Sequence, residues 1–334
     1  KTVFFFFSSK FSMIFNALSD CNLLKILAID SVERSMKISV ACNLGFQTIM
    51  DFVIPISLIK EVKSVEIFSQ YTNSKQGKLR FHSNSFNYPI IKFLVLFFKM
   101  LSKTNKNTKL IVGIYEIPYG ILALLVGKIK GIPVCINIIG NPAYKKLRYG
   151  IRKLITDFAL TNVDSITVCG QNSKTYLSTQ GIAESKVYAL PNSIDLNLFK
   201  KLEIPKKYDI ITVCRLSHEK RIDLLLKITQ LLKISNPEIL VGVAGKGPEE
   251  EKLEKLIVDF DLVDNVKLLG YVDDLTEFYN SGKIFILTSE TEGLPRTILE
   301  SMACQTPTIC SNVGDVSDAI IDSDNSFLID EFDN

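Results

Sequence analysis

The sequence predicts an α/β fold in which two doubly wound, Rossmann-like domains each hold a parallel sheet, with a cleft between them. Short continuous apolar runs, such as residues 110–114 and 284–287, alternate with longer segments whose apolar residues recur at helical spacing. Parallel strands that helices cover on both faces have this pattern. The chain has 334 residues, of which 47% are apolar, so it can form two cores of ordinary size.

Strands and helices are expected to alternate through the first half, with short connections. The first strand begins at Met36, and Gly45 stands in the loop that follows it. Neighbouring parallel strands need a helix-length crossover, which the intervening segments supply. The strands are expected at residues 36–43, 65–70, 110–114, 133–139 and 165–169, and the helices at 46–59, 88–101, 119–130 and 143–160.

The boundary between the domains is expected near Pro191. Leu-Pro-Asn-Ser-Ile-Asp at 190–195 leads into a charged stretch, as a linker between two folded parts does. The predicted domains are therefore residues 36–191 and 192–334. Beyond the linker, strands are expected at 210–213, 239–244 and 284–287, and a helix at 297–304.

Residues 1–35 are left unassigned. Lys10 interrupts the apolar run that begins with the phenylalanines at 4–7, so the segment resembles neither a well-formed signal peptide nor a strand. We interpret it as a candidate artefact of upstream translation, with Met36 as the natural start. A secretory signal is the alternative.

Charge is divided unevenly along the chain. Residues 1–191 hold 24 Lys and Arg against 10 Asp and Glu, whereas residues 192–334 hold 15 against 26. A basic half indicates an anionic partner such as an acidic phospholipid surface or a nucleic acid. No nucleic-acid recognition motif is found, so lipid is preferred. The apolar helix at 88–101 with its neighbouring lysines, and the basic residues at 145–148, fit such a surface, and an ordinary core helix is the alternative.

Cysteines and paired acids argue against a metal or disulfide framework. The seven cysteines are scattered without a C-x-x-C pair, which is typical of buried thiols in a reducing, cytoplasmic compartment. We interpret the acids at Asp273–Asp274 and at 322–324 as helix caps and loop residues. No run of eighteen uncharged apolar residues predicts a membrane span.

The strongest chemical signal is a pair of glutamates, Glu292 and Glu300, that stand eight positions apart across a strand-to-helix junction. A buried strand precedes them and Pro295 begins the helix, so Glu292 falls in the loop and Glu300 on the helix. Gly293 permits a close backbone approach, and the free N–H groups at a helix start suit phosphate or sugar hydroxyls. Taken alone, either glutamate could equally be a solvated surface acid.

Four motifs in order resemble the C-terminal domain of the family 4 retaining glycosyltransferases of GT-B fold, over residues 208–325. The glutamate pair matches the E-x7-E motif of that family, and the order and spacing of all four match as well. The other three are Val-Cys-Arg-Leu-Ser-His-Glu-Lys at 213–220, Ala-Gly-Lys-Gly-Pro-Glu at 244–249 and Leu-Gly-Tyr-Val at 269–272.

The resemblance implies roles for the residues in these motifs. Arg215 and Lys220 would clamp the diphosphate of a nucleotide-sugar donor, as fixed cations facing a leaving group that gains charge. Glu292 would lie by the donor sugar and Glu300 would bind the ribose hydroxyls. The backbone N–H groups of Gly293 and Leu294 would add hydrogen bonds to the donor.

Further candidates are weaker. Gly245 would form a tight turn beside the nucleotide, although a purely structural turn is about as plausible, and Glu250 replaces the third glycine of a dinucleotide fingerprint. Tyr271 would lie by the base, with core packing as the alternative. Gly45 would lie near the acceptor or phosphate. Many relatives carry a catalytic histidine where this chain has Ile139, so Asn141 is the tentative substitute.

The expected function is therefore transfer of a sugar from a UDP- or GDP-sugar to a glycan or lipid-linked acceptor, in envelope polysaccharide synthesis. The enzyme would need no metal or other cofactor, would bind no nucleic acid, and would work in the cytoplasm or peripherally on the inner membrane face. Relatives continue beyond the point that matches Asn334, so we expect a truncated chain of low activity. The alternatives are a nucleotide-sugar epimerase or soluble-acceptor synthase on the same fold, or a degenerate non-catalytic binder.

Overall fold

A computed structural model describes most of the chain, and its contacts divide the residues into two compact units. The described residues are 36–42, 46–69, 77–83, 88–144, 149–192, 194–320 and 326–330. Unit 1 runs to Val168 and includes Lys174–Leu190, whereas unit 2 comprises Cys169–Ser173 and the chain from Pro191 onward. The short segment at 169–173 thus packs with the second unit, which the sequence does not predict.

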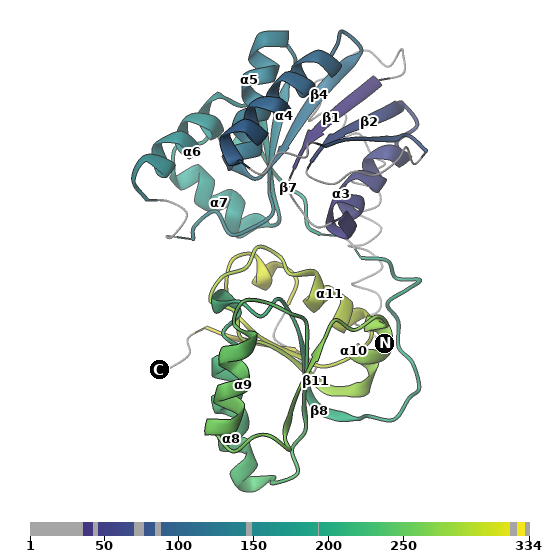
Figure 1. The fold of residues 1–334 in the computed structure, drawn as a ribbon, viewed down its shortest axis with the longest axis vertical. Helices are drawn as coiled ribbons and strands as arrows, with labels where there is room; N and C mark the ends of the chain where they lie inside the picture. The colour runs from purple at the N-terminus through teal and green to yellow at the C-terminus, as the bar shows by residue number, and fades with distance from the viewer. Residues whose placement is uncertain are drawn as a thin grey trace. The chain divides into compact units, whose positions relative to one another are not determined.

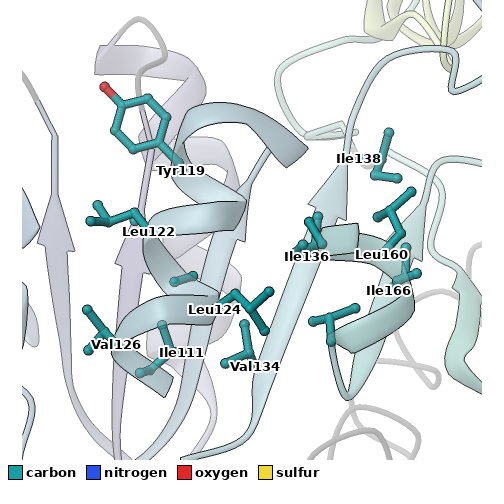
Figure 2. Close-up of a cluster of buried hydrophobic side chains, with 14 of the residues drawn as sticks. Ile111, Tyr119, Leu122, Leu124, Val126, Val134, Ile136, Ile138, Leu160 and Ile166 are labelled. Carbon is teal, nitrogen blue, oxygen red and sulfur yellow. The ribbon is translucent and has the colours of Figure 1, made fainter. Parts of the chain in front are cut away.

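Unit 1 is a seven-stranded parallel sheet in the order β3-β2-β1-β4-β5-β6-β7. One apolar cluster packs α4 to α7 against the sheet, as Figure 2 shows around α5, and a second cluster includes residues of α3. The strands are β1 (Met36–Ala41), β2 (Val62–Phe68), β3 (Leu79–His82), β4 (Thr108–Ile114), β5 (Val134–Ile138), β6 (Ser165–Val168) and β7 (Val187–Ala189), and the α-helices are α3 (Phe46–Leu58), α4 (Pro89–Lys103), α5 (Ile121–Lys130), α6 (Gly150–Asn162) and α7 (Gln171–Thr179).

Unit 2 is a six-stranded parallel sheet in the order β10-β9-β8-β11-β12-β13. Its helices α8 and α9 bury Leu225, Leu226 and Leu253 in one core cluster with strand residues (Figure 1). The strands are β8 (Tyr208–Val213), β9 (Val241–Ala244), β10 (Val266–Gly270), β11 (Gly282–Leu287), β12 (Thr308–Ser311) and β13 (Ser326–Ile329), and the α-helices are α8 (Ile222–Ser235), α9 (Glu250–Asp259), α10 (Leu275–Ser281) and α11 (Arg296–Ala303).

The predicted α/β alternation is confirmed, but several boundaries were wrong. The helix expected at 143–160 begins only at Gly150, because the Asn141 side chain accepts the Ala143 N–H at 2.8 Å and closes a turn there. β2 begins three residues before its predicted start. Pro295 is the extended N-cap of α11 and does not lie in its first turn.

Candidate functional site

Two loops of unit 2 meet where the strand order reverses. From β8 the chain moves outward to β9 and β10, and it then returns to place β11 on the other side of β8. In open parallel sheets, ligands bind at the carboxyl ends of strands flanking such a switch point. The loop after β8 carries Arg215 and Lys220, and the loop after β11 carries Glu292. The sequence motifs therefore converge on the position where the topology favours a ligand.

Hydrogen bonds hold these two loops together. The Glu290 N–H donates to the Glu219 carbonyl at 2.8 Å. The Thr288 hydroxyl lies 3.0 Å from the Lys220 carbonyl and 2.9 Å from that of Arg221. These bonds fix the backbone on either side of Lys220, so the position of its side chain is set by both strands.

An ion pair between Lys220 and Glu292 crosses the junction. Lys220 Nζ donates to Glu292 Oε1 at 2.5 Å, and the two side chains are 19% and 9% exposed. The pair brings together residues 72 positions apart in the sequence. Three lysine protons surround one nitrogen, so Lys220 can contact Glu292 and a second anion at the same time.

Glu300 is buried on α11 behind this pair. Its Oε2 accepts the Tyr279 hydroxyl at 2.9 Å, and Arg296 lies 3.6 Å from its Oε1. Burial and the neighbouring Glu300 charge raise the pKa of Tyr279 well above its ordinary value, so the phenol remains a donor. Glu300 is 6% exposed, so it is not the solvated surface acid of the alternative reading.

Arg215 adds an exposed cation on the same loop. Among the described residues it forms no ion pair, which leaves its guanidinium available. Burial acts to raise the pKa of Glu219, but the Ser217 hydroxyl, at 2.6 Å, and the charges of Arg215 and Lys220 lower it overall. The loop thus presents two cations and keeps its own carboxylate ionised.

The glycine turn after β9 supports the Arg215 loop from below. Gly245 has a φ of +128°, and a Cβ there would lie 1.8 Å from the Cys214 carbonyl oxygen. The Leu216 N–H donates to the Lys246 carbonyl at 3.1 Å. Gly245 therefore acts through packing, which is the structural role that the sequence left open.

The remaining predicted residues differ in their placement. Gly293 and Leu294 are buried, and their carbonyls accept hydrogen bonds from the Asp315 N–H and the Asn192 side chain. Tyr271 is 80% exposed, with Lys246 Nζ 6.0 Å from its ring centre, so the core-packing alternative was wrong for it.

In unit 1, Asn141 follows β5, and its side-chain oxygen is used in the turn described above. Ile139 is partly buried and packs against the apolar core of the unit. Gly45, the basic residues at 145–148 and the acids at 322–324 lie outside the described residues. Asp274 caps α10 by accepting the Glu277 N–H at 2.8 Å, as the sequence predicted.

Sequence reasoning missed two hydroxyls and a supporting glycine at the junction. The Oγ atoms of Ser289 and Thr291 are buried and have no hydrogen-bond partner within the described structure. Gly314, at a φ of +61°, packs so closely that a Cβ would lie 1.9 Å from the Glu292 carbonyl oxygen. Serine and threonine between two acids carry no pattern that marks them as ligands, and Gly314 is distant in sequence.

No three His, Cys, Asp or Glu side chains of the described residues cluster as metal ligands. The described helices are also all too short or too polar to cross a bilayer.

Comparisons with known proteins converge on one family. Residues 194–334 match the family model described as glycosyl transferases group 1. An uncharacterized glycosyltransferase of Haemophilus influenzae is 30% identical over 182 residues, 54% of this chain and 51% of its own. One polypeptide of the phosphatidylinositol N-acetylglucosaminyltransferase of Arabidopsis thaliana is 29% identical over 174 residues, 50% of this chain and 39% of its own. The chain thus spans about half or less of these curated relatives.

Solved structures share the fold over most of the chain. Anabaena HepE in complex with UDP-glucose is 18% identical with a TM-score of 0.74, covering 88% of this chain and 85% of its own. Sucrose-phosphate synthase from Thermosynechococcus elongatus is also 18% identical, with a TM-score of 0.72 and coverage of 88% and 86%. At this identity the likeness concerns the fold, two Rossmann-like units of the GT-B type.

Proposed function

We propose, from the premise that this chain belongs to the group 1 glycosyltransferases of GT-B fold, that it transfers a sugar from a nucleotide-diphosphate sugar to a glycan or lipid-linked acceptor. One observation carries the proposal: the Lys220–Glu292 pair, with Arg215 on the same loop as Lys220, lies at the switch point of the unit 2 sheet. Such a site offers fixed cations to a diphosphate and carboxylates to sugar hydroxyls.

The proposed chemistry follows from where charge develops. As the bond between the anomeric carbon and the diphosphate breaks, Arg215 and Lys220 would stabilise the departing phosphate. Glu292, which lies 2.5 Å from Lys220 Nζ, would face the donor sugar, and Glu300 would bind the ribose. The acceptor oxygen would attack the same face of the sugar, its proton passing to the leaving phosphate, so that configuration is retained.

A UDP-sugar is the first donor to test. HepE has been solved with UDP and with UDP-glucose, and pneumococcal GtfA with UDP and GlcNAc. Relatives named for O-antigen biosynthesis and for phosphatidylinositol glycosylation support a lipid-linked or envelope acceptor. We propose a cytoplasmic enzyme that needs no metal, working at an anionic membrane surface.

The membrane part of the proposal is supported by an exposed apolar surface on α4 and α6, which both pack against α5 (Figure 1). Ile90, Phe98 and Ile151 are 77%, 63% and 75% exposed. Apolar residues flanked by cations suit an acidic bilayer surface. The exposed apolar residues are Tyr88, Ile90, Ile91, Leu94 and Phe98 near or on α4 and Tyr149, Ile151, Leu154, Ile155 and Phe158 near or on α6, and the helices also carry Lys92, Lys99, Lys103, Arg152 and Lys153.

The experiment is a titration of the protein with UDP and GDP by calorimetry, followed by product mass analysis with UDP- and GDP-sugars. Lys220→Ala should weaken nucleotide binding, whereas Lys227→Ala, an exposed lysine on neighbouring α8, should not. Mass gain on an added acceptor would support transfer. Donor isomerisation without acceptor would indicate an epimerase, and nucleotide binding without any turnover would indicate a non-catalytic binder. Failure to bind either nucleotide would contradict the proposal.

A further inference from the structure

A second polar pocket lies in unit 1, on the sheet face that α4 covers. Its volume is about 410 Å³, within the range of small-molecule sites. Lys37 stands near the amino end of β1, and Asn105 follows the end of α4, so the pocket does not belong to the carboxyl-end loops of the switch point. It is lined by Lys37, Glu66, Arg80, Phe81, His82, Ser102, Lys103 and Asn105.

A buried carboxylate organises this pocket. Glu66 is 5% exposed and lies opposite Arg80 in the β2–β3 register. His82 Nε2 lies 2.7 Å from Glu66 Oε2, whereas Arg80 Nε and Lys37 Nζ lie 3.6 and 3.8 Å from Oε1. Only the histidine is at the distance of a strong hydrogen bond.

The pocket has more positive than negative charge. Lys37, Arg80 and Lys103 face a single carboxylate, Glu66, and Lys103 forms no ion pair with any described residue. Arg80 approaches Glu66 through Nε, which leaves its terminal N–H groups for another anion. A concave site with excess charge of one sign concentrates ligands of the opposite sign. Solvated cations on a flat surface would lack this effect.

We propose that this pocket binds a small phosphate dianion, either inorganic phosphate or a phosphate monoester. Two excess positive charges match the charge of a phosphate near neutral pH, and the guanidinium fork of Arg80 suits its oxygens. Ser102 and Asn105 add a hydroxyl and an amide at the rim, and Phe81 forms an apolar wall beside an organic substituent. This site is separate from the proposed donor site in unit 2 and does not depend on it.

The two histidines of the chain distinguish the sites. His82 lies in this pocket, and His218 lies on the loop between Arg215 and Lys220. We would record the ring Cε1–H signals by NMR, assigned with a His218→Gln variant, while adding inorganic phosphate, glycerol 3-phosphate or, as an uncharged control, glycerol. The proposal expects saturable movement of the His82 signal with either phosphate compound and none with glycerol. UDP should instead move the His218 signal, so failure of the donor site would be seen separately.

Variants at exposed positions test the contacts without disturbing the buried carboxylate. Arg80→Gln combined with Lys103→Gln should weaken phosphate binding at least about tenfold, judged by calorimetry. Lys63→Gln combined with Lys109→Gln removes the same charge from exposed positions on β2 and β4 outside the pocket and should leave binding unchanged. No saturation of the His82 signal up to ~10 mM of either phosphate compound, or equal loss in both double variants, would overturn the proposal.

Discussion

At the residue scale, the Lys220–Glu292 pair concentrates the chemistry of unit 2. Lys220→Ala would remove a phosphate-facing cation and leave Glu292, only 9% exposed, without its partner. A charge-assisted hydrogen bond contributes about 1.5–3 kcal/mol, so nucleotide affinity should fall about tenfold to a hundredfold. Calorimetric titration with UDP measures this, with Lys227→Ala as the control. Equal affinity in Lys220→Ala and wild type would exclude Lys220 from the clamp.

Glu292 and Glu300 should respond differently to loss of charge. Glu292→Gln should chiefly slow turnover, by about a hundredfold, because its charge is proposed to act on the reacting sugar. Glu300→Gln should chiefly raise the donor KM, because Glu300 is proposed to bind the ribose. Steady-state kinetics with one donor over a range of concentrations separates the two. The same change in kcat and KM for both variants would argue that they act as one unit.

Glu66 gives the stability of unit 1 a defined pH dependence. Burial acts to raise the pKa of Glu66, but His82, Lys37 and Arg80 outweigh it and lower the pKa below its ordinary value of 4.5. A lowered folded-state pKa stabilises the fold above the unfolded value, and this stabilisation is lost as pH falls through the folded value. Glu66→Gln should therefore be less stable than wild type near pH 7, and the difference should shrink in acid below pH 4.5. Urea unfolding at several pH values tests this, and a constant difference would contradict it.

At the element scale, the turn after β9 should tolerate no side chain at Gly245. Gly245→Ala would combine a φ of +128° with a contact of 1.8 Å to the Cys214 carbonyl, so the turn must move. We expect a loss of roughly 3 kcal/mol or more in the free energy of unfolding. Gly270→Ala is the matched control, because its φ is +64° and its Cβ would meet only the flexible Lys246 side chain. Equal melting temperatures for the two variants would show that the turn is not strained.

Elements with long apolar runs could be predicted from sequence, whereas those set by local polar contacts could not. β4, β5 and β11 are continuous apolar segments, and they were found with small errors at their ends. The start of α6 was missed because it depends on a side-chain turn at Asn141. The four-residue strand β3 was missed because Leu79–His82 is half polar and partly exposed, which leaves no buried run to detect.

The same contrast holds at the site. The motifs at 213–220 and 292–300 could be placed together because parallel strands end at one edge of a sheet. Their pairing in space, Lys220 with Glu292, could not be read from spacing, because the order of strands in the sheet is not written in the chain. The pocket around Glu66 was invisible for a related reason: its lining residues come from β1, β2, β3 and the end of α4 and form no motif.

At the scale of the whole molecule, the exposed apolar surface of α4 and α6 should determine where the protein works. Vesicles rich in acidic phospholipid should sediment the protein at low salt, and binding should weaken as salt screens the lysines. Phe98→Asp combined with Ile151→Asp should abolish sedimentation. Leu231→Asp combined with Ile234→Asp, at exposed apolar positions on α8 of the other unit, should not. Sedimentation that survives the first double variant would assign membrane binding elsewhere.

The pairing of Lys220 with Glu292 also bears on how fast a donor can arrive. A carboxylate that already neutralises the cation weakens the long-range field of the empty loop, so Arg215 alone remains to attract a diphosphate from a distance. Association would then be only mildly accelerated by electrostatic steering, and its rate should vary little with ionic strength. Selectivity among the many phosphorylated metabolites of a cell would accordingly arise from the lifetime of the complex, after contact, and not from the frequency of encounters.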